Sequence, residues 1–151
     1  MTTPAHKTPQ QTADGVREGM WANDRAGKAL GMRIISVTPG QAVLEMVVRE
    51  DMLNGHDICH GGLIATLADT AFAYACNSYD ELTVASGFSI DLLAPGHLGD
   101  VLTASAHEVS KTGRTGLYDI EVKNQAGKRV AVFRGRSHTL RGKPAVPATR
   151  A

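Results

Sequence analysis

Residues 61–77 carry apolar side chains with the spacing of an α-helix. Residues three or four positions apart lie on the same face of a helix, and two such rows are apolar throughout. The rows are Leu63, Leu67, Ala71 and Ala75, and Ile64, Ala68, Phe72 and Cys76. Most other positions are Ala, Thr or Gly, so the pattern predicts a core helix that protein surrounds on most sides.

Six further segments are rich in residues that favour strands. Two precede the helix, at residues 32–38 and 42–48, and four follow it, at 83–93, 101–109, 116–123 and 128–140. In the first of these four, Phe88, Ile90 and Leu92 alternate with small or polar residues, which predicts an antiparallel sheet with one face in water. The order β-β-α-β-β-β-β predicts an α+β domain in which one sheet wraps around one buried helix.

The two ends of the chain differ in composition from its middle. Residues 1–14 are rich in Thr, Pro, Gln and Lys, and we expect them to be disordered. A weaker helical pattern covers residues 15–30 and stops at Gly31. Residues 142–151, which include two prolines, predict a flexible tail. Residues 15–141 are therefore expected to form a single domain.

The overall composition favours a protein without nucleic-acid or membrane partners. The 151 residues include 16 Lys and Arg against 15 Asp and Glu, a balance that gives no general attraction to polyanions. No apolar run approaches the roughly 20 residues that span a bilayer, and the polar N-terminus does not look like a secretion signal. Cys59 and Cys76 would lie roughly 25 Å apart along the helix, too far for a disulfide. Two reduced thiols lead us to expect a cytoplasmic location.

The only carboxylate of the predicted helix is Asp69. A buried acid costs free energy unless it has a partner or a chemical role. It could be a structural group, a general base that activates water, or a nucleophile. The glycines before it favour chemistry, because a helix that begins at Gly61 offers free N–H groups that can hold a developing oxyanion. Without Asp69, the simpler explanation of Gly61 would be a turn that requires glycine.

Two polar residues upstream could support this pair. His60 could cap the helix, orient the loop or contact the carbonyl, and Asn54 could hold a water or brace Asp69. Asn54 is equally typical of an ordinary Asn-Gly turn. His56, Asp57 and His60 lack a second pair of ligands at helical spacing, so no metal site is predicted.

Basic residues gather late in the chain. They are Lys111, Arg114, Lys128, Arg129, Arg134, Arg136 and Arg141. Such charges usually mark solvated strand ends, although some could pair with the phosphates of a substrate that carries a nucleotide.

Together these residues resemble the hotdog-fold acyl-CoA thioesterases, and within them the PaaI-type branch of phenylacetate degradation. The similarity extends from about Trp21 to Leu140. Its most specific parts are Met52-Leu53-Asn54-Gly55-His56, Cys59-His60-Gly61-Gly62 and the run from Leu67 to Asn77. Val84-Ala85-Ser86, Ile90-Asp91, Pro95-Gly96, Tyr118-Asp119-Ile120 and Phe133-Arg134-Gly135 support it further.

The resemblance implies a hotdog fold, in which a curved antiparallel sheet of about five to six strands wraps a long central helix. It also implies dimers that join two sheets edge to edge, a dimer of dimers, and an active site at the dimer interface. The Gly61 N–H would hold the thioester oxygen, Asp69 of the partner subunit would activate water or attack, and Asn54 and His60 would support them.

The resemblance also implies a substrate and its contacts. The expected reaction is hydrolysis of an aryl-acyl-CoA such as phenylacetyl-CoA or hydroxyphenylacetyl-CoA, without a cofactor or metal. Gly62 and Ser86 would contact the substrate, Ser86 in place of a catalytic hydroxyl found in some relatives. Lys111, Arg114 and Arg136 would bind the CoA phosphates. The alternatives are a thioesterase for other acyl-CoAs, an acyl-CoA binding module and a hydratase of the same fold.

Overall fold

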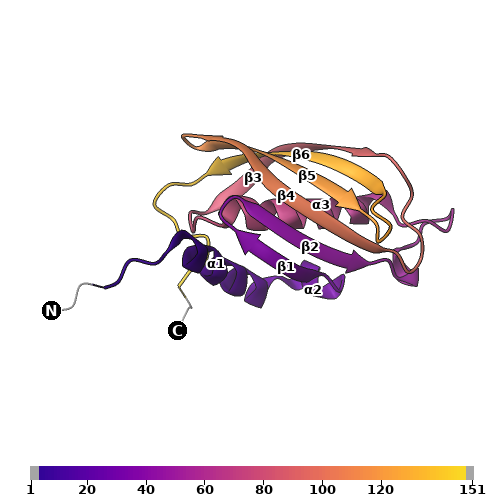
Figure 1. The fold of residues 1–151 in the computed structure, drawn as a ribbon, viewed down its shortest axis with the longest axis horizontal. Coiled ribbons are helices and arrows are strands. Elements are labelled where there is room, and N and C mark those ends of the chain that lie inside the picture. Colours follow the sequence, from indigo (N-terminus) through magenta and orange to yellow (C-terminus); the bar gives the residue numbers. More distant parts are fainter. Residues whose placement is uncertain (1–3, 149–151) are drawn as a thin grey trace.

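A single antiparallel sheet packs against one long helix (Figure 1). The structure, a computed structural model, describes residues 4–148. Its helices are α1 (Pro9–Asn23), α2 (Arg25–Ala29), the 3₁₀ turn η1 (Glu50–Met52) and α3 (Gly61–Asn77). Its strands are β1 (Arg33–Thr38), β2 (Gln41–Val47), β3 (Thr83–Leu92), β4 (Val101–Thr112), β5 (Thr115–Lys123) and β6 (Arg129–Thr139).

The six strands follow the order β1-β2-β4-β5-β6-β3, and every neighbouring pair is antiparallel. The helix α3 covers one face of this sheet and contacts all six strands. This arrangement confirms the predicted hotdog fold, with the predicted helix at residues 61–77 and all six predicted strands.

The apolar face of α3 forms the centre of the core. The Phe72 ring packs against Tyr118 at 5.5 Å and against Phe133 at 6.1 Å between centroids. Beneath Phe72, the strand β6 carries Gly135, where an added Cβ would lie 2.8 Å from the ring. Glycine at this position therefore lets the helix approach the sheet closely.

The N-terminal helix begins earlier than the sequence predicted. Residues 9–14, expected to be disordered, form the start of α1. Thr8 and Gln11 make a capping box, in which the Gln11 N–H donates to Thr8 Oγ1 and the Thr8 N–H donates to Gln11 Oε1. Pro9 follows at the first position of the helix, where its missing N–H costs nothing. These local signals outweigh the polar composition of the segment.

The predicted helix at residues 15–30 is divided at Asp24. The Asp24 carboxylate accepts a hydrogen bond of 2.8 Å from the Gly27 N–H and so caps α2. Its other oxygen accepts a hydrogen bond of 2.9 Å from the hydroxyl of buried Tyr74 on α3. Asp24 therefore ends one helix, starts the next and ties both to the core.

The segment after β6 contacts the domain, although it was predicted to be a flexible tail. Lys143 O accepts a hydrogen bond of 2.8 Å from the Leu82 N–H. Ala145 is buried, and the Val146 side chain packs directly on Gly19 of α1. Figure 1 shows this segment beside α1. Residues 149–151 of the predicted tail lie outside the described residues.

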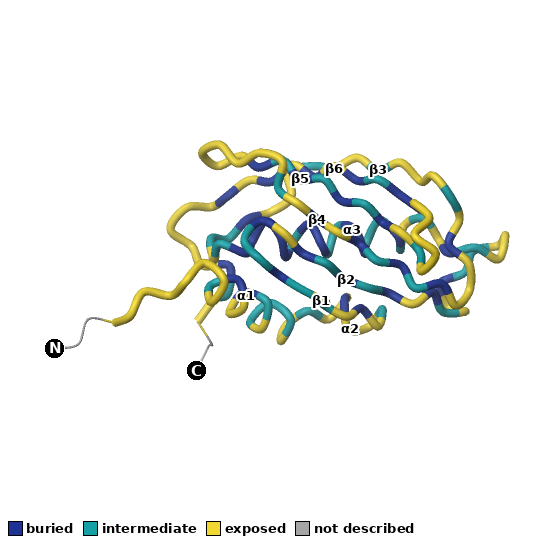
Figure 2. The backbone as a smooth tube through the Cα atoms, viewed as in Figure 1, coloured by how far each residue is buried: buried dark blue, intermediate teal, exposed yellow. Residues whose placement is uncertain are grey.

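The two edges of the sheet differ in how they are covered. At the β1 edge, α1 donates side-chain hydrogen bonds to strand carbonyls, from Gln10 Nε2 to Val37 O at 2.9 Å and from Arg17 to Ile34 O at 2.8 Å. At the other edge, nearly all of β3 is exposed or half-buried (Figure 2). Only the β3 edge is therefore left open by the described part of the chain, and open edges invite a further strand.

The apolar residues of β3 face the helix side of the sheet, as their alternation predicted. Ile90 pairs with buried Phe133, and Leu92 pairs with buried Ala131. Phe88 stacks on Phe133 at 4.7 Å between centroids, yet it remains 46% exposed. The inner face of the edge strand is thus apolar but uncovered.

None of the helices formed by residues 4–148 is long and apolar enough to cross a membrane.

Candidate functional site

The first turn of α3 leaves one backbone donor unused. His60 is the N-cap, and its Nδ1 accepts a hydrogen bond of 2.9 Å from the Gly62 N–H. The His60 carbonyl accepts from the Leu63 N–H at 2.9 Å and from the Ile64 N–H at 3.4 Å. Among residues 4–148, no acceptor lies within hydrogen-bond distance of the Gly61 N–H. This N–H therefore remains available to a ligand at the positive end of the helix dipole.

A groove of about 400 Å³ opens beside this N–H. Its lining residues are Asn54, Ile58, Cys59, Gly61, Ile64, Leu92, Leu93, Ala94 and Pro95. The structure thus brings Asn54 and Gly61 to the same groove. The lining by Ile58, Ile64 and residues 92–95 was not predicted, because it depends on how the end of β3 packs against the start of α3.

Asn54 fixes the loop that forms one wall of this groove. Its Oδ1 accepts hydrogen bonds from the His56 N–H at 2.9 Å and the Ile58 N–H at 3.4 Å. The Asn54 N–H donates to Ile58 O at 2.8 Å. The side-chain amide Nδ2 has no acceptor among the described residues, so it is a second free donor in the groove.

Asp69 lies on the one stripe of α3 that the sheet leaves partly exposed. Thr66, Thr70 and Ala73 share this stripe and are also half-buried. Within residues 4–148, the Asp69 carboxylate has neither a hydrogen-bond donor nor an ion-pair partner. Burial without compensation raises the pKa of this carboxyl above its usual value. A free carboxylate with a raised pKa is a candidate base.

Gly61 and Asp69 cannot act on the same atom within one chain. Eight helical positions separate them on α3, which corresponds to roughly 12 Å along the axis. A site that used both groups on one substrate atom would therefore require a second chain.

Ser86 and the three basic residues among the predicted contacts lie outside the groove lining. Ser86 occupies the bulge of β3, and its hydroxyl donates to Arg136 O at 3.1 Å. Arg136 lies across Gly87, and the Lys111 ammonium lies over the Tyr79 ring at 3.9 Å from its centroid. Arg114 is in the turn between β4 and β5. Lys111, Arg114 and Arg136 have no carboxylate partner in the described part of the chain, so their charges are available to an anion. Gly62 is exposed beside Gly61.

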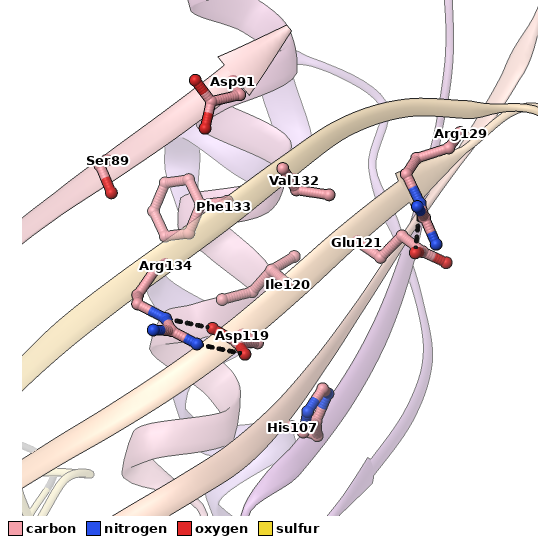
Figure 3. Close-up of a pocket in the computed structure, with 10 residues that line it drawn as sticks. All are labelled: Ser89, Asp91, His107, Asp119, Ile120, Glu121, Arg129, Val132, Phe133 and Arg134. Atoms are coloured by element: carbon pink, nitrogen blue, oxygen red, sulfur yellow. Dashed lines mark hydrogen bonds and ion pairs between the residues drawn. The ribbon is translucent and has the colours of Figure 1, made fainter. Parts of the chain in front are cut away.

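The outer face of the sheet carries a second groove, of about 510 Å³ (Figure 3). Here Arg134 donates two hydrogen bonds to Asp119, at 2.7 and 2.8 Å. This contact lowers the pKa of the Asp119 carboxyl. Glu121 pairs with Lys123 and Arg129, which lower its pKa in the same way. Arg129 and Arg134, the two arginines of this groove, are both paired with carboxylates. The groove also lies on the face opposite α3, which carries Gly61 and Asp69, so it is not the candidate site.

No metal-binding cluster is present among residues 4–148, where no three His, Cys, Asp or Glu side chains converge. Both cysteines are free and buried. Burial raises the pKa of the Cys76 thiol to about 12, so this thiol is not activated as a nucleophile.

Comparison with known proteins assigns the family. Residues 56–131 match the thioesterase superfamily. The chain is 54% identical over 123 residues to the acyl-coenzyme A thioesterase PaaI of Escherichia coli strain K12, covering 82% of this chain and 88% of that protein. The chain belongs to the thioesterase superfamily. It is a thioester hydrolase of the hotdog fold, as the sequence predicted.

Solved structures of similar proteins support this assignment. The structure of the E. coli PaaI protein from the phenylacetic acid degradation operon superposes with a TM-score of 0.88 at 50% identity, over 90% of this chain and 99% of that one. The protein smu.793 from Streptococcus mutans UA159, bound to acetyl CoA, superposes with a TM-score of 0.70 at 28% identity. That match covers 72% of this thioesterase and 88% of the other chain.

Proposed function

We propose that this thioesterase hydrolyses aryl-acyl-CoA esters, such as phenylacetyl-CoA or its ring-hydroxylated forms, in the catabolism of aromatic compounds. The similarity to the PaaI protein of a phenylacetic acid degradation operon supports the substrate class. The observation that carries the mechanism is the unused Gly61 N–H, which opens into a groove with mostly apolar walls.

The complete site is formed by two chains in this proposal. Two observations support it, the open β3 edge and the roughly 12 Å between Gly61 and Asp69 along the helix. A partner strand that pairs antiparallel with β3 would cover exposed Phe88 and the uncovered stripe of α3. It would place Asp69 of one subunit beside Gly61 of the other. Two such dimers would then associate into a tetramer.

The reaction begins with the thioester carbonyl oxygen at the Gly61 N–H. In this proposal Asn54 Nδ2 donates a second hydrogen bond. His60 accepts from the Gly62 N–H and so holds the first turn of α3 in place. The hydrogen bonds from these donors become stronger as the oxygen becomes negative, which lowers the barrier for addition to the carbonyl carbon.

Asp69 of the other subunit supplies the base. Its carboxylate removes a proton from a water molecule, and the water oxygen forms a bond to the carbonyl carbon. The tetrahedral intermediate then collapses, the C–S bond breaks, and the proton passes to the departing CoA thiolate. Direct attack by the carboxylate is the alternative, with an acyl anhydride that water hydrolyses in a second step. Neither route requires a metal or redox cofactor.

The CoA portion extends along the surface in this proposal. Lys111, Arg114 and Arg136 are the cationic side chains that we assign to its phosphates, because each is without a carboxylate partner among residues 4–148. Gly62 and Ser86 are assigned to contacts with the arm between the phosphates and the thioester.

A panel of CoA esters tests the proposed substrate class. We expect phenylacetyl-CoA to be hydrolysed with a kcat/KM at least about 10-fold above those of acetyl-CoA and palmitoyl-CoA, because pocket fit is worth factors of this size. Release of free thiol measures the reaction, and loss of an enoyl absorbance from crotonyl-CoA tests for hydratase activity. Preference for acetyl-CoA or palmitoyl-CoA would contradict the aryl assignment.

A further inference from the structure

The Leu92 side chain lies directly against the start of α3. A Cβ added to Gly61 would lie 2.6 Å from Leu92 Cδ1 and 3.9 Å from Leu92 Cγ. Within residues 4–148, no other atom outside its chain neighbours and the nearby helix backbone would lie within 4 Å of it. Leu92 is the last residue of β3 and is 53% exposed. The apolar side chain of Leu92 thus covers Gly61, the residue that carries the unused N–H, while about half of Leu92 remains exposed.

The chemistry of the groove indicates which part of a substrate would enter it. Asn54 is the only residue with a polar side-chain amide or charge in the lining, and the other side chains are apolar. A thioester bound through its carbonyl at Gly61 has two substituents. The pantetheine arm carries amides that would lose their hydrogen bonds to water without gaining partners in this groove, which costs free energy. An apolar acyl group would instead be stabilised by leaving water.

We propose that Leu92 determines which acyl groups this thioesterase accepts, because it forms the wall of the acyl subsite next to the carbonyl. The inference rests on the proposed function of the Gly61 N–H. A smaller residue at position 92 widens the subsite and favours bulky acyl groups. A larger residue narrows it and leaves room only for short ones.

Two substitutions in opposite directions test this role. Leu92→Ala is expected to raise the ratio of kcat/KM for naphthylacetyl-CoA to that for acetyl-CoA by about 10-fold or more, since a few methylenes in a pocket are worth this much. Leu92→Trp is expected to lower kcat/KM for phenylacetyl-CoA by about 10-fold or more while acetyl-CoA changes little. Leu98→Ala is the matched control, because Leu98 is 58% exposed and lies outside the groove. It should leave all ratios unchanged.

Binding of a ketone analogue separates failure of this inference from failure of the proposed function. S-(2-oxo-3-phenylpropyl)-CoA keeps the aryl group and a carbonyl but cannot be hydrolysed. If the wild type binds the analogue without hydrolysing any ester, the proposed function fails. The Kd values of the Leu92 variants for the analogue still show whether residue 92 affects binding of the aryl group. Equal changes for all esters and for the analogue in both Leu92 variants would overturn the inference, as would absence of analogue binding by the wild type. An unchanged thermal unfolding midpoint shows that each variant is folded.

Discussion

Replacing Asp69 with Asn is expected to lower kcat for the preferred CoA ester by about 10²- to 10⁴-fold, the usual contribution of a general base. The amide is nearly the same size as the carboxylate but cannot take a proton from water or attack the carbonyl carbon. KM should change much less, because Asp69 acts after the substrate is bound. In the wild type, kcat/KM should rise with pH through the raised pKa of Asp69, and the variant should lose this dependence.

The same substitution is expected to stabilise the protein. Burial raises the folded-state pKa of Asp69 above its unfolded value, so the folded chain binds a proton more readily than the unfolded chain. Ionised Asp69 therefore costs stability once the pH exceeds the unfolded value of about 3.9. Relative to Asp69→Asn, the free energy of unfolding of the wild type should fall as the pH rises through this range, and denaturant titrations measure the difference.

Asp14→Asn is the matched control, because Asp14 is an exposed carboxylate on α1, away from the β3 edge. We expect this variant to keep wild-type kcat and its pH profile. Wild-type turnover by Asp69→Asn across the panel of CoA esters would show that Asp69 is a structural group.

Replacing Gly61 with Pro is expected to lower kcat by about 10²- to 10³-fold, the usual cost of losing one oxyanion donor. Proline removes the N–H and nothing else from the hydrogen bonds of the helix, because this N–H has no acceptor in the described part of the chain. Proline is also favoured at the first helical position, and the backbone of His60 before it is already extended, with φ −56° and ψ 127°. The fold should therefore tolerate the change.

Gly61→Ala separates loss of the donor from loss of space. Both variants place a Cβ against Leu92, but only Ala keeps the N–H. We expect Gly61→Ala to retain clearly more activity than Gly61→Pro with the same ester. Equal activity of the two variants would mean that the N–H does not hold the substrate, and circular dichroism verifies that α3 is intact in each.

The main elements were predictable because their side-chain periodicity matches their burial. The rows that contain Leu67 and Phe72 are the face of α3 that packs on the sheet, and the alternation at Phe88, Ile90 and Leu92 gave the correct side of β3. The start of α1 was missed because its signals are a local capping box and contacts with distant residues. Gln10, for example, donates to Val37 O, 27 residues away.

The site was predictable in its residue types but not in its geometry. The sequence indicated that the start of α3 offers an N–H group. Only the structure shows that the N–H groups of Gly62, Leu63 and Ile64 donate to His60, so that the Gly61 N–H is the one without an acceptor. Leu92 could not be placed beside Gly61, because 31 positions separate them in the chain. The open edge of β3 could not be foreseen either, since it depends on which strand α1 covers.

Complementation between two inactive variants tests the shared site most directly. Asp69→Asn and Gly61→Pro are each expected to keep at most about 1% of wild-type activity alone. A one-to-one mixture of the two chains should form mixed dimers by exchange or co-expression. Each mixed dimer contains one intact site, built from Gly61 of one chain and Asp69 of the other. Random pairing then restores about a quarter of wild-type activity per protomer in a symmetric dimer. Activity of the mixture that stays at the level of the separate variants, with mixed dimers demonstrated by mass spectrometry, would contradict the account.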